Sequence, residues 1–274
     1  MTTLTLAPTA GPRPLADTLT MLRRNLLRAR RYPALTSFTI GIPVVLLLLF
    51  VFVFGGALGA GVAPGVAPGA DGRAAYLDYI TPAILLFAVV GAAQSVAITA
   101  AMDATGGIMA RFKTMAISSG SVLGGPVLGT VIQAVLAGAV VLGLAVALGY
   151  RPRAGVLDWW ALAGLIALAA FALSWLCVAM GLAAKSVETA SNTPMILTAL
   201  PFLGSGFVPV ETMPAGVRAF AEYQPFTPII ETARTLLAGT ALDAATTVQA
   251  VAWCVLIAGV GYGWSRSLYR RERR

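Results

Sequence analysis

A charged island between two long apolar runs is the first feature of the sequence that could do chemistry. It reads MDATGGIMARFKTM, with Asp103 near its start and Arg111 and Lys113 towards its end. An acid at the beginning and bases at the end suit the dipole of a short helix. We therefore predict a short amphipathic helix at about 103–115, where a soluble partner could press on the rest of the chain.

A second pair of charges, Glu231 and Arg234, lies in an otherwise apolar segment, PIIETARTLL. The two residues are three positions apart, so on a helix they would be neighbours and could neutralise each other while partly buried. The alternative is an ordinary solvated pair on a surface helix. The sequence leaves both readings open.

Several kinds of chemistry lack the residues they need. The nearest approach to a phosphate-binding loop, 179–186, has alanine where both required glycines belong. The chain has no histidine, and its apolar runs contain almost no ionisable group that could relay protons. We therefore assign no catalytic residue, no metal ligand and no cofactor-binding residue, and any energy for work must come from another chain.

The composition is that of an integral membrane protein. Of the 274 residues, 58% are hydrophobic and only 11% are charged, whereas a soluble domain has about 25% charged residues. Because the long apolar runs lack the alternation of membrane strands, the predicted fold class is all-α. The net charge of +8 comes from basic residues at the ends of the apolar runs, so it indicates orientation in a membrane and no binding of nucleic acid.

The apolar runs predict six transmembrane helices. Their expected bounds are about 35–58, 80–101, 121–148, 159–183, 193–207 and 247–268. With this arrangement 14 basic residues fall on one side and 5 on the other, which places both termini in the cytoplasm. Glycines spaced four apart in the third run, Gly120 with Gly124 and Gly125 with Gly129, predict a close approach of another helix.

The regions outside the spans have distinct patterns. Residues 1–14 are expected to be a disordered tail, and 15–31 an amphipathic helix in the membrane interface. Its leucines share one face, while Arg24, Arg28 and Arg31 lie on the other and would meet anionic head groups. The alternative for this segment is a plain basic flank. Residues 32–274 form the six-span domain, with an outer region at about 208–243.

The whole pattern resembles the membrane subunits of type 2 ABC exporters, in particular the daunorubicin-resistance permease family. One part of the resemblance is Asp103-x-x-x-Gly107-x-x-x-Arg111 directly after the second span. Another is GSGFVP at 204–209, followed by Met213-Pro214. The last is YQPFTP at 223–228 with Glu231 and Arg234. The outer motif residues are Gly206, Pro209, Pro214, Pro225, Glu231 and Arg234.

The resemblance implies a function for each region. Asp103, Gly107, Arg111 and Lys113 would belong to a coupling helix that meets a cytoplasmic ATPase, and the outer region would form short re-entrant helices. Two ATPase copies would bind ATP and Mg, and a second permease, identical or a sister subunit, would complete the channel. The chain itself would not be an enzyme. Its substrate would be drug-like or lipid-like; the alternatives are export of a lipid-linked glycan and a non-transporting membrane scaffold.

Overall fold

The computed structural model describes residues 14–31, 33–62, 70–108 and 119–271. Its long helices are α1 (Pro14–Arg31), α2 (Pro33–Leu49), α4 (Ala70–Thr105), α6 (Ser119–Ala147), α7 (Val156–Ala183) and α12 (Ala244–Arg271). Within these described residues, five helical stretches are long and apolar enough to cross a bilayer: Ser37–Gly59, Gly72–Thr105, Gly120–Ala147, Val156–Ala183 and Ala244–Arg270. The predicted class, an all-helical multi-pass membrane protein, is confirmed.

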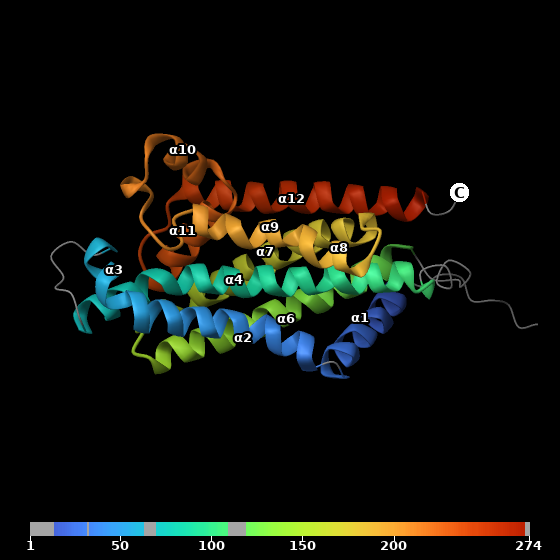
Figure 1. The fold of residues 1–274 in the computed structure, drawn as a ribbon, viewed down its shortest axis with the longest axis horizontal. Helices are drawn as coiled ribbons and strands as arrows, with labels where there is room; N and C mark the ends of the chain where they lie inside the picture. Colours follow the sequence, from blue (N-terminus) through green and yellow to red (C-terminus); the bar gives the residue numbers. More distant parts are fainter. Residues whose placement is uncertain (1–13, 32, 63–69, 109–118, 272–274) are drawn as a thin grey trace, which may run out of the picture.

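Helix α4 is the centre of the bundle. It packs against α2, α6 and α7, and α12 in turn packs against α7 (Figure 1). Within the protein, 72% of the apolar stretch of α4 is buried, compared with 17% of the apolar stretch of α12. Helix α12 therefore leaves most of its apolar surface for lipid or for another chain.

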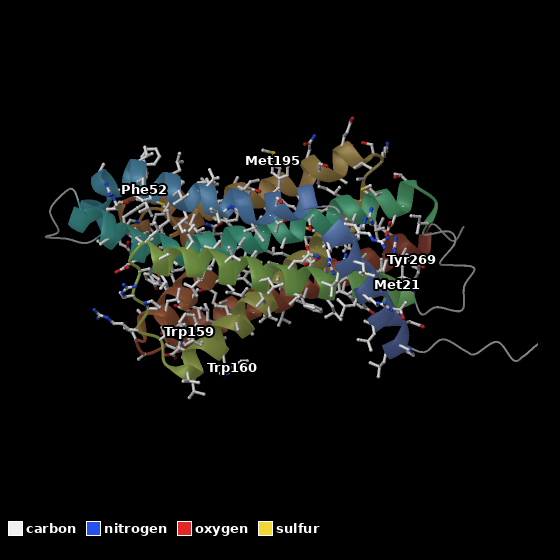
Figure 2. The ribbon with its side chains drawn as sticks, turned by 90° about the horizontal axis from the view of Figure 1, so that it is seen from below. Met21, Phe52, Trp159, Trp160, Met195 and Tyr269 are labelled. Carbon is white, nitrogen blue, oxygen red and sulfur yellow. The ribbon has the colours of Figure 1, made fainter. Side chains whose placement is uncertain are left out.

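The two ends of the bundle differ in what they carry. Helix α1 and the C-terminal end of α12 lie at the same end, called here the α1 end (Figure 1). The short helix α3 (Gly55–Val62) lies at the opposite end, called the α3 end. Trp159 and Trp160 lie towards the α3 end, far from Met21 and Tyr269 at the α1 end (Figure 2). Because α1 and the C-terminal end of α12 lie at the same end, the chain between them must run along the bundle an even number of times.

The second predicted span is longer than expected. Helix α4 begins at Ala70 and ends at Thr105, whereas hydropathy placed the span at about 80–101. Asp71, Arg73 and Asp78 made the first ten residues look like a loop. A helix does not have to end where its apolar section ends, because its polar turns can extend into the interface. The first span is interrupted in turn by a π-helical section, Phe50–Phe54, which joins α2 to α3.

The predicted fifth span, 193–207, is not one helix. Residues 187–203 form four short pieces: α8 (Val187–Asn192), η2 (Thr193–Met195), α9 (Ile196–Ala199) and η3 (Leu200–Leu203). Pro194 and Pro201 explain the breaks, because proline has no N–H to donate within a helix. Gln94 of α4 donates to the carbonyl oxygen of Pro194 at 3.1 Å and to the hydroxyl of Thr198 at 2.5 Å. These two bonds fix the middle of the broken segment to α4.

Short helices close the α3 end of the bundle (Figure 1). They are η4 (Val210–Thr212), α10 (Ala215–Tyr223) and α11 (Phe226–Ala238). Most of α11 is buried against α4, α7 and α12. Pro209, Pro214 and Pro225 stand directly before η4, α10 and α11, where a missing N–H costs no helical bond.

Candidate functional site

Helix α1 is docked into a row of small and polar residues on α6. Ser121, Gly125, Gly129 and Gln133 occur at every fourth position, so they lie along one face of the helix. A Cβ at Gly125 would come within 2.3 Å of the Met21 Cβ, and one at Gly129 within 2.2 Å of the Asn25 Oδ1. Glycine at both positions therefore permits the contact, and α1 is the close neighbour predicted for this pair. A Cβ at Gly120 or Gly124, the other predicted pair, would meet no described atom within 4 Å.

Polar groups border this contact. The amide of Gln133 donates to Asn25 at 3.1 Å, and the hydroxyls of Thr18 and Ser121 lie 3.0 Å apart. Ser121 also donates to the carbonyl oxygen of Pro14 at 2.9 Å. Such hydrogen bonds between helices fix the position of α1 along the axis of α6. Apolar packing alone would determine this position less precisely.

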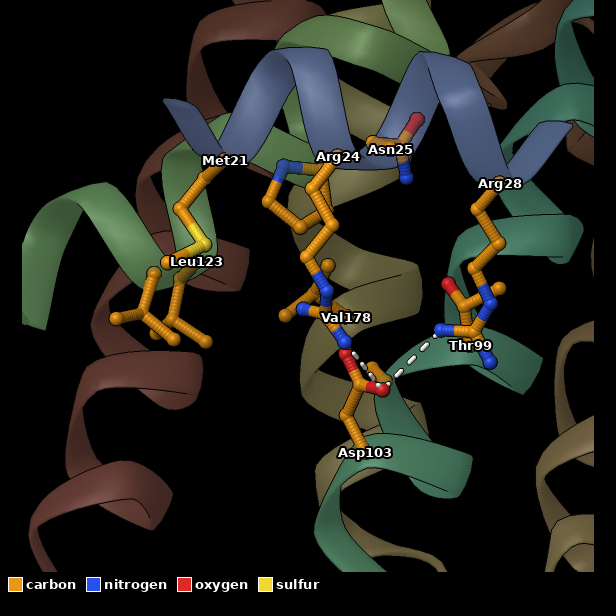
Figure 3. Close-up of a pocket in the computed structure, with 11 residues that line it drawn as sticks. Met21, Arg24, Asn25, Arg28, Thr99, Asp103, Leu123 and Val178 are labelled. Atoms are coloured by element: carbon orange, nitrogen blue, oxygen red, sulfur yellow. Dashed lines mark hydrogen bonds and ion pairs between the residues drawn. The ribbon is translucent and has the colours of Figure 1, made fainter. Parts of the chain in front are cut away.

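The charged centre of the site is Asp103, near the end of α4. Arg24 and Arg28 of α1 both donate to its Oδ1 at 3.1 Å (Figure 3). The carboxylate is buried while both arginines keep partial access to water. A buried carboxylate is costly unless it is paired, so Asp103 gives the two arginines a reason to face the bundle.

A cavity of about 30 Å³ lies beside these charges, enough space for about two water molecules. Figure 3 shows Arg24 and Arg28 reaching down from α1 to Asp103, with Met21 next to Leu123 at the other side of the cavity. The cavity therefore lies where α1, α4 and α6 meet. Its size suits hydration of the ion cluster and is too small for a drug-sized molecule.

These contacts correct two predictions about the arginines and the island. Arg24 and Arg28 were expected to face lipid head groups, yet they point to Asp103, and Arg31 is the exposed member of the three. Asp103 was expected to begin a short helix at about 103–115, yet it lies in the last turn of α4. Hydropathy assigned the charge to the next element, although pairing with the two arginines allows Asp103 to stay in the long helix.

Gly107 has a conformational role that the sequence did not reveal. Its φ is +69°, in the left-handed region that glycine adopts without strain, and it follows directly after the end of α4. The chain therefore turns at Gly107 before it enters the connection to α6. Arg111 and Lys113 lie outside the described residues.

The second predicted pair, Glu231 and Arg234, is partly buried at the α3 end. The Arg234 guanidinium bonds Glu231 and donates to the carbonyl oxygen of Ser205 at 3.0 Å. It also lies 4.0 Å above the ring of Tyr79, whose hydroxyl donates to the same Ser205 oxygen at 2.8 Å. The side chains are 20% and 34% exposed for Arg234 and Glu231, so the partly buried alternative is the correct one.

The outer motif is held by this cluster. Gly206 lies so close to α4 and α11 that a Cβ would come within 3.0 Å of Ala83 and 3.3 Å of Ile230. The hydroxyl of Tyr76 donates to the carbonyl oxygen of Phe207 at 3.3 Å. Sequence reasoning missed Tyr76, Tyr79 and Ser205, because a tyrosine at the end of a span is first read as an interface anchor.

The sequence does contain a pattern that predicts the contact between α1 and α6. Ser121 and Gln133 extend the Gly125–Gly129 spacing by one step in each direction, which marks a longer stripe facing one neighbour. Asn25 and Thr18 are polar residues on α1 that meet this stripe. A search for four-residue spacing of small and polar residues together would have found the whole contact.

The fold and the site define a multi-pass helical membrane protein with the docked helix α1 at one end and the buried short helix α11 at the other. Residues 16–238 match the ABC-2 type transporter family. The chain is 30% identical over 238 residues to the daunorubicin resistance ABC transporter permease protein DrrB1 of Streptomyces coeruleorubidus, covering 85% of this chain and 80% of that protein. The chain belongs to the ABC-2 type transporter family and is a permease-type membrane subunit.

Proposed function

We propose that this chain is the permease half of an ATP-driven exporter that moves a hydrophobic or amphipathic, drug-like molecule outward across the cytoplasmic membrane. Its similarity to a daunorubicin resistance permease supports a drug-like substrate. The scarcity of ionisable groups in the spans supports an amphipathic molecule that needs no charged path. The observation that carries the proposal is the ion cluster of Arg24, Arg28 and Asp103 at the root of the α4–α6 connection.

The proposed topology has six crossings, with residues 187–203 as the fifth. At about 1.5–2.0 Å per residue this broken segment reaches about 25–34 Å, close to the roughly 30 Å of a bilayer core. Gln94 contacts it halfway, and Tyr79 contacts the loop that follows it, so it runs along α4 towards the α3 end. The 14 to 5 distribution of basic residues supports a cytoplasmic position for the α1 end and both termini.

The proposed contact with the ATPase lies in the connection between α4 and α6. Gly107 turns the chain out of α4, and Arg111 and Lys113 follow in the sequence. Arg111 would supply a forked donor for a carboxylate or for backbone carbonyls of the partner. In this proposal Asp103 holds α4 in place and does not itself contact the ATPase.

The complete exporter would contain two permeases, two cytoplasmic ATPases and the ATP and Mg bound to them. The second permease would be an identical copy or a sister subunit. The helices α10 and α11 would enter the outer leaflet and return, which the burial of α11 against α4, α7 and α12 supports. The lipid contact of α1 would use Arg31 together with the exposed Arg23 and Arg30, in place of Arg24 and Arg28.

The test is to purify the tagged chain from its native membranes and identify the proteins that accompany it. We expect a chain with a phosphate-binding loop, and we expect daunorubicin to stimulate ATP hydrolysis by the complex in lipid vesicles. The control is the same complex with the phosphate-loop lysine of the ATPase changed to alanine. Stimulation by a lipid-linked sugar but not by daunorubicin would contradict the proposed substrate class. Purification without any ATPase would favour a scaffold.

A further inference from the structure

Helix α1 contacts both ends of the α4–α6 connection. These ends, the last turn of α4 and the first turn of α6, are called here the two roots of the connection. Asp103, which bonds Arg24 and Arg28, lies two residues before the end of α4 at Thr105. Ser121, which bonds Pro14 and lies against Thr18, comes two residues after the start of α6. One helix thus binds the last turn of one span and the first turn of the next.

The two contacts lie at different positions along α1, so the helix bridges the roots. Its N-terminal part, from Pro14 to Thr18, holds the α6 root, and the part from Arg24 to Arg28 holds the α4 root. The middle of α1 lies against Gly125 and Gly129, where the backbones are closest. Because α2 begins at Pro33, directly beyond α1, the bridge also leads into the first span.

We propose that α1 is a clasp that keeps the two roots at a fixed separation, so that a push on the α4–α6 connection moves α4 and α6 as one body. The inference rests on the proposed function, because it assumes that an ATPase presses on this connection. It differs from an interface helix that only lies on lipid: a clasp must stay docked throughout the transport cycle. Its polar face serves the protein, while its exposed leucines contact the membrane.

A disulfide tests whether α1 stays docked. A Cβ at Gly129 would lie 3.2 Å from the Cβ of Asn25, near the separation of about 3.5–4.5 Å in disulfides. The pair Asn25→Cys and Gly129→Cys is made in a chain whose two cysteines, both buried, are changed to alanine. We expect the oxidised complex to keep daunorubicin-stimulated ATP hydrolysis and transport in vesicles. Loss of both on oxidation, with recovery on reduction, would show that α1 must leave, and would overturn the clasp.

Loosening the clasp tests whether it is needed. Gly125→Leu places a side chain where Met21 lies, whereas a Cβ at Gly124 on the same helix meets no described atom within 4 Å. Gly124→Leu is therefore the matched control. We expect Gly125→Leu to retain the ATPase in a pull-down but to lose transport by about tenfold, within the usual range for coupling between sites. Equal transport by the two variants would contradict the proposal.

A milder variant covers the case in which Gly125→Leu fails to assemble. Asp103→Asn keeps the shape of the side chain and removes the charge that Arg24 and Arg28 share. We expect the same separation of ATPase binding from transport, and the control is Glu188→Gln on the exposed side of α8. A wild-type chain that binds no ATPase contradicts the proposed function. A working wild type with working Gly125→Leu and Asp103→Asn variants contradicts only the clasp.

Discussion

Asp103 shows how one buried carboxylate orients a helix that packs against it. Two guanidinium groups share its Oδ1 beside the small cavity. Arg24 and Arg28 therefore turn towards the bundle, while Arg23, Arg30 and Arg31 of the same helix are exposed.

The turn at Gly107 predicts opposite changes in stability for alanine at two different glycines. Its positive φ strains any side chain, so Gly107→Ala should reduce the free energy of unfolding by about 1 kcal/mol. Gly124 is helical with open space around it, so Gly124→Ala should instead increase stability, by about 0.5–1 kcal/mol. Thermal unfolding of both variants in the same detergent measures the difference. A loss of stability in both would mean that the turn at Gly107 is not what sets the effect.

Among the elements, α11 depends most on one side chain. Arg234 connects it to the Ser205 carbonyl oxygen and to Tyr79 of α4. Arg234→Lys keeps the charge but loses the planar fork that makes several bonds at once. We expect faster amide hydrogen exchange in 204–209 and in α11, with no change in α1. The control is Arg218→Lys, whose side chain bonds only Glu222 among the described residues. Unchanged exchange in 204–209 would show that packing alone holds the outer motif.

Helix α12 depends on Asp243 for its first turn. The Oδ2 of Asp243 accepts from the backbone N–H of Thr246 at 2.9 Å and from its hydroxyl at 2.6 Å. These bonds to Thr246 lower the pKa of Asp243 below its ordinary value of 3.8. A lowered pKa means that the cap contributes its full stability above pH 3.8 and loses it as the pH falls through the folded-state value.

The expected outcome is fraying of α12 in acid. Amide exchange in the first turn, corrected for intrinsic rates, should increase relative to the rest of α12 between about pH 6 and about pH 3. Asp243→Asn should remove this pH dependence, because its amide oxygen accepts the same bonds without titrating. The same acid response in Asp243→Asn would assign the fraying to another group.

For the whole molecule, the broken segment 187–203 decides the topology. Lys185 lies before it and Glu222 lies beyond it, and both are exposed. If the segment crosses the membrane, the two residues lie on opposite sides. In a chain without cysteines, Glu222→Cys should react with a membrane-impermeant maleimide in intact cells, and Lys185→Cys should react only after permeabilisation. Labelling of both from outside would mean that the segment turns back without crossing.

The sequence predicted the fold best for the spans that a long apolar run is enough to identify. Four of the predicted spans coincide with long apolar helices to within a few residues, and α4 extends beyond the expected range. The fifth prediction was wrong as a continuous helix because hydropathy does not register the backbone bonds that Pro194 and Pro201 remove. A crossing in several short pieces can be as apolar as a straight one.

The candidate site was harder to predict because a membrane changes what a polar face means. In water an amphipathic helix turns its leucines to the protein, yet Leu15 and Leu19 of α1 are 83% and 65% exposed. Lipid can cover such leucines, so the polar face is free to bind Asp103 and Gln133. Periodicity found both faces of α1 but could not tell which one meets the protein.

The mixed geometry of 187–203 has a mechanical consequence. Three residues in η2 and four in η3 are 3₁₀-helical, with a rise of about 2.0 Å each, against about 1.5 Å in an α-helix. Rewinding them would shorten the segment by about 3.5 Å. Because Pro194 and Pro201 donate no backbone bond in either form, few bonds distinguish the long form from the short one. If residues 187–203 cross the bilayer as proposed, their length could follow a change in bilayer thickness while α4 beside them keeps its length.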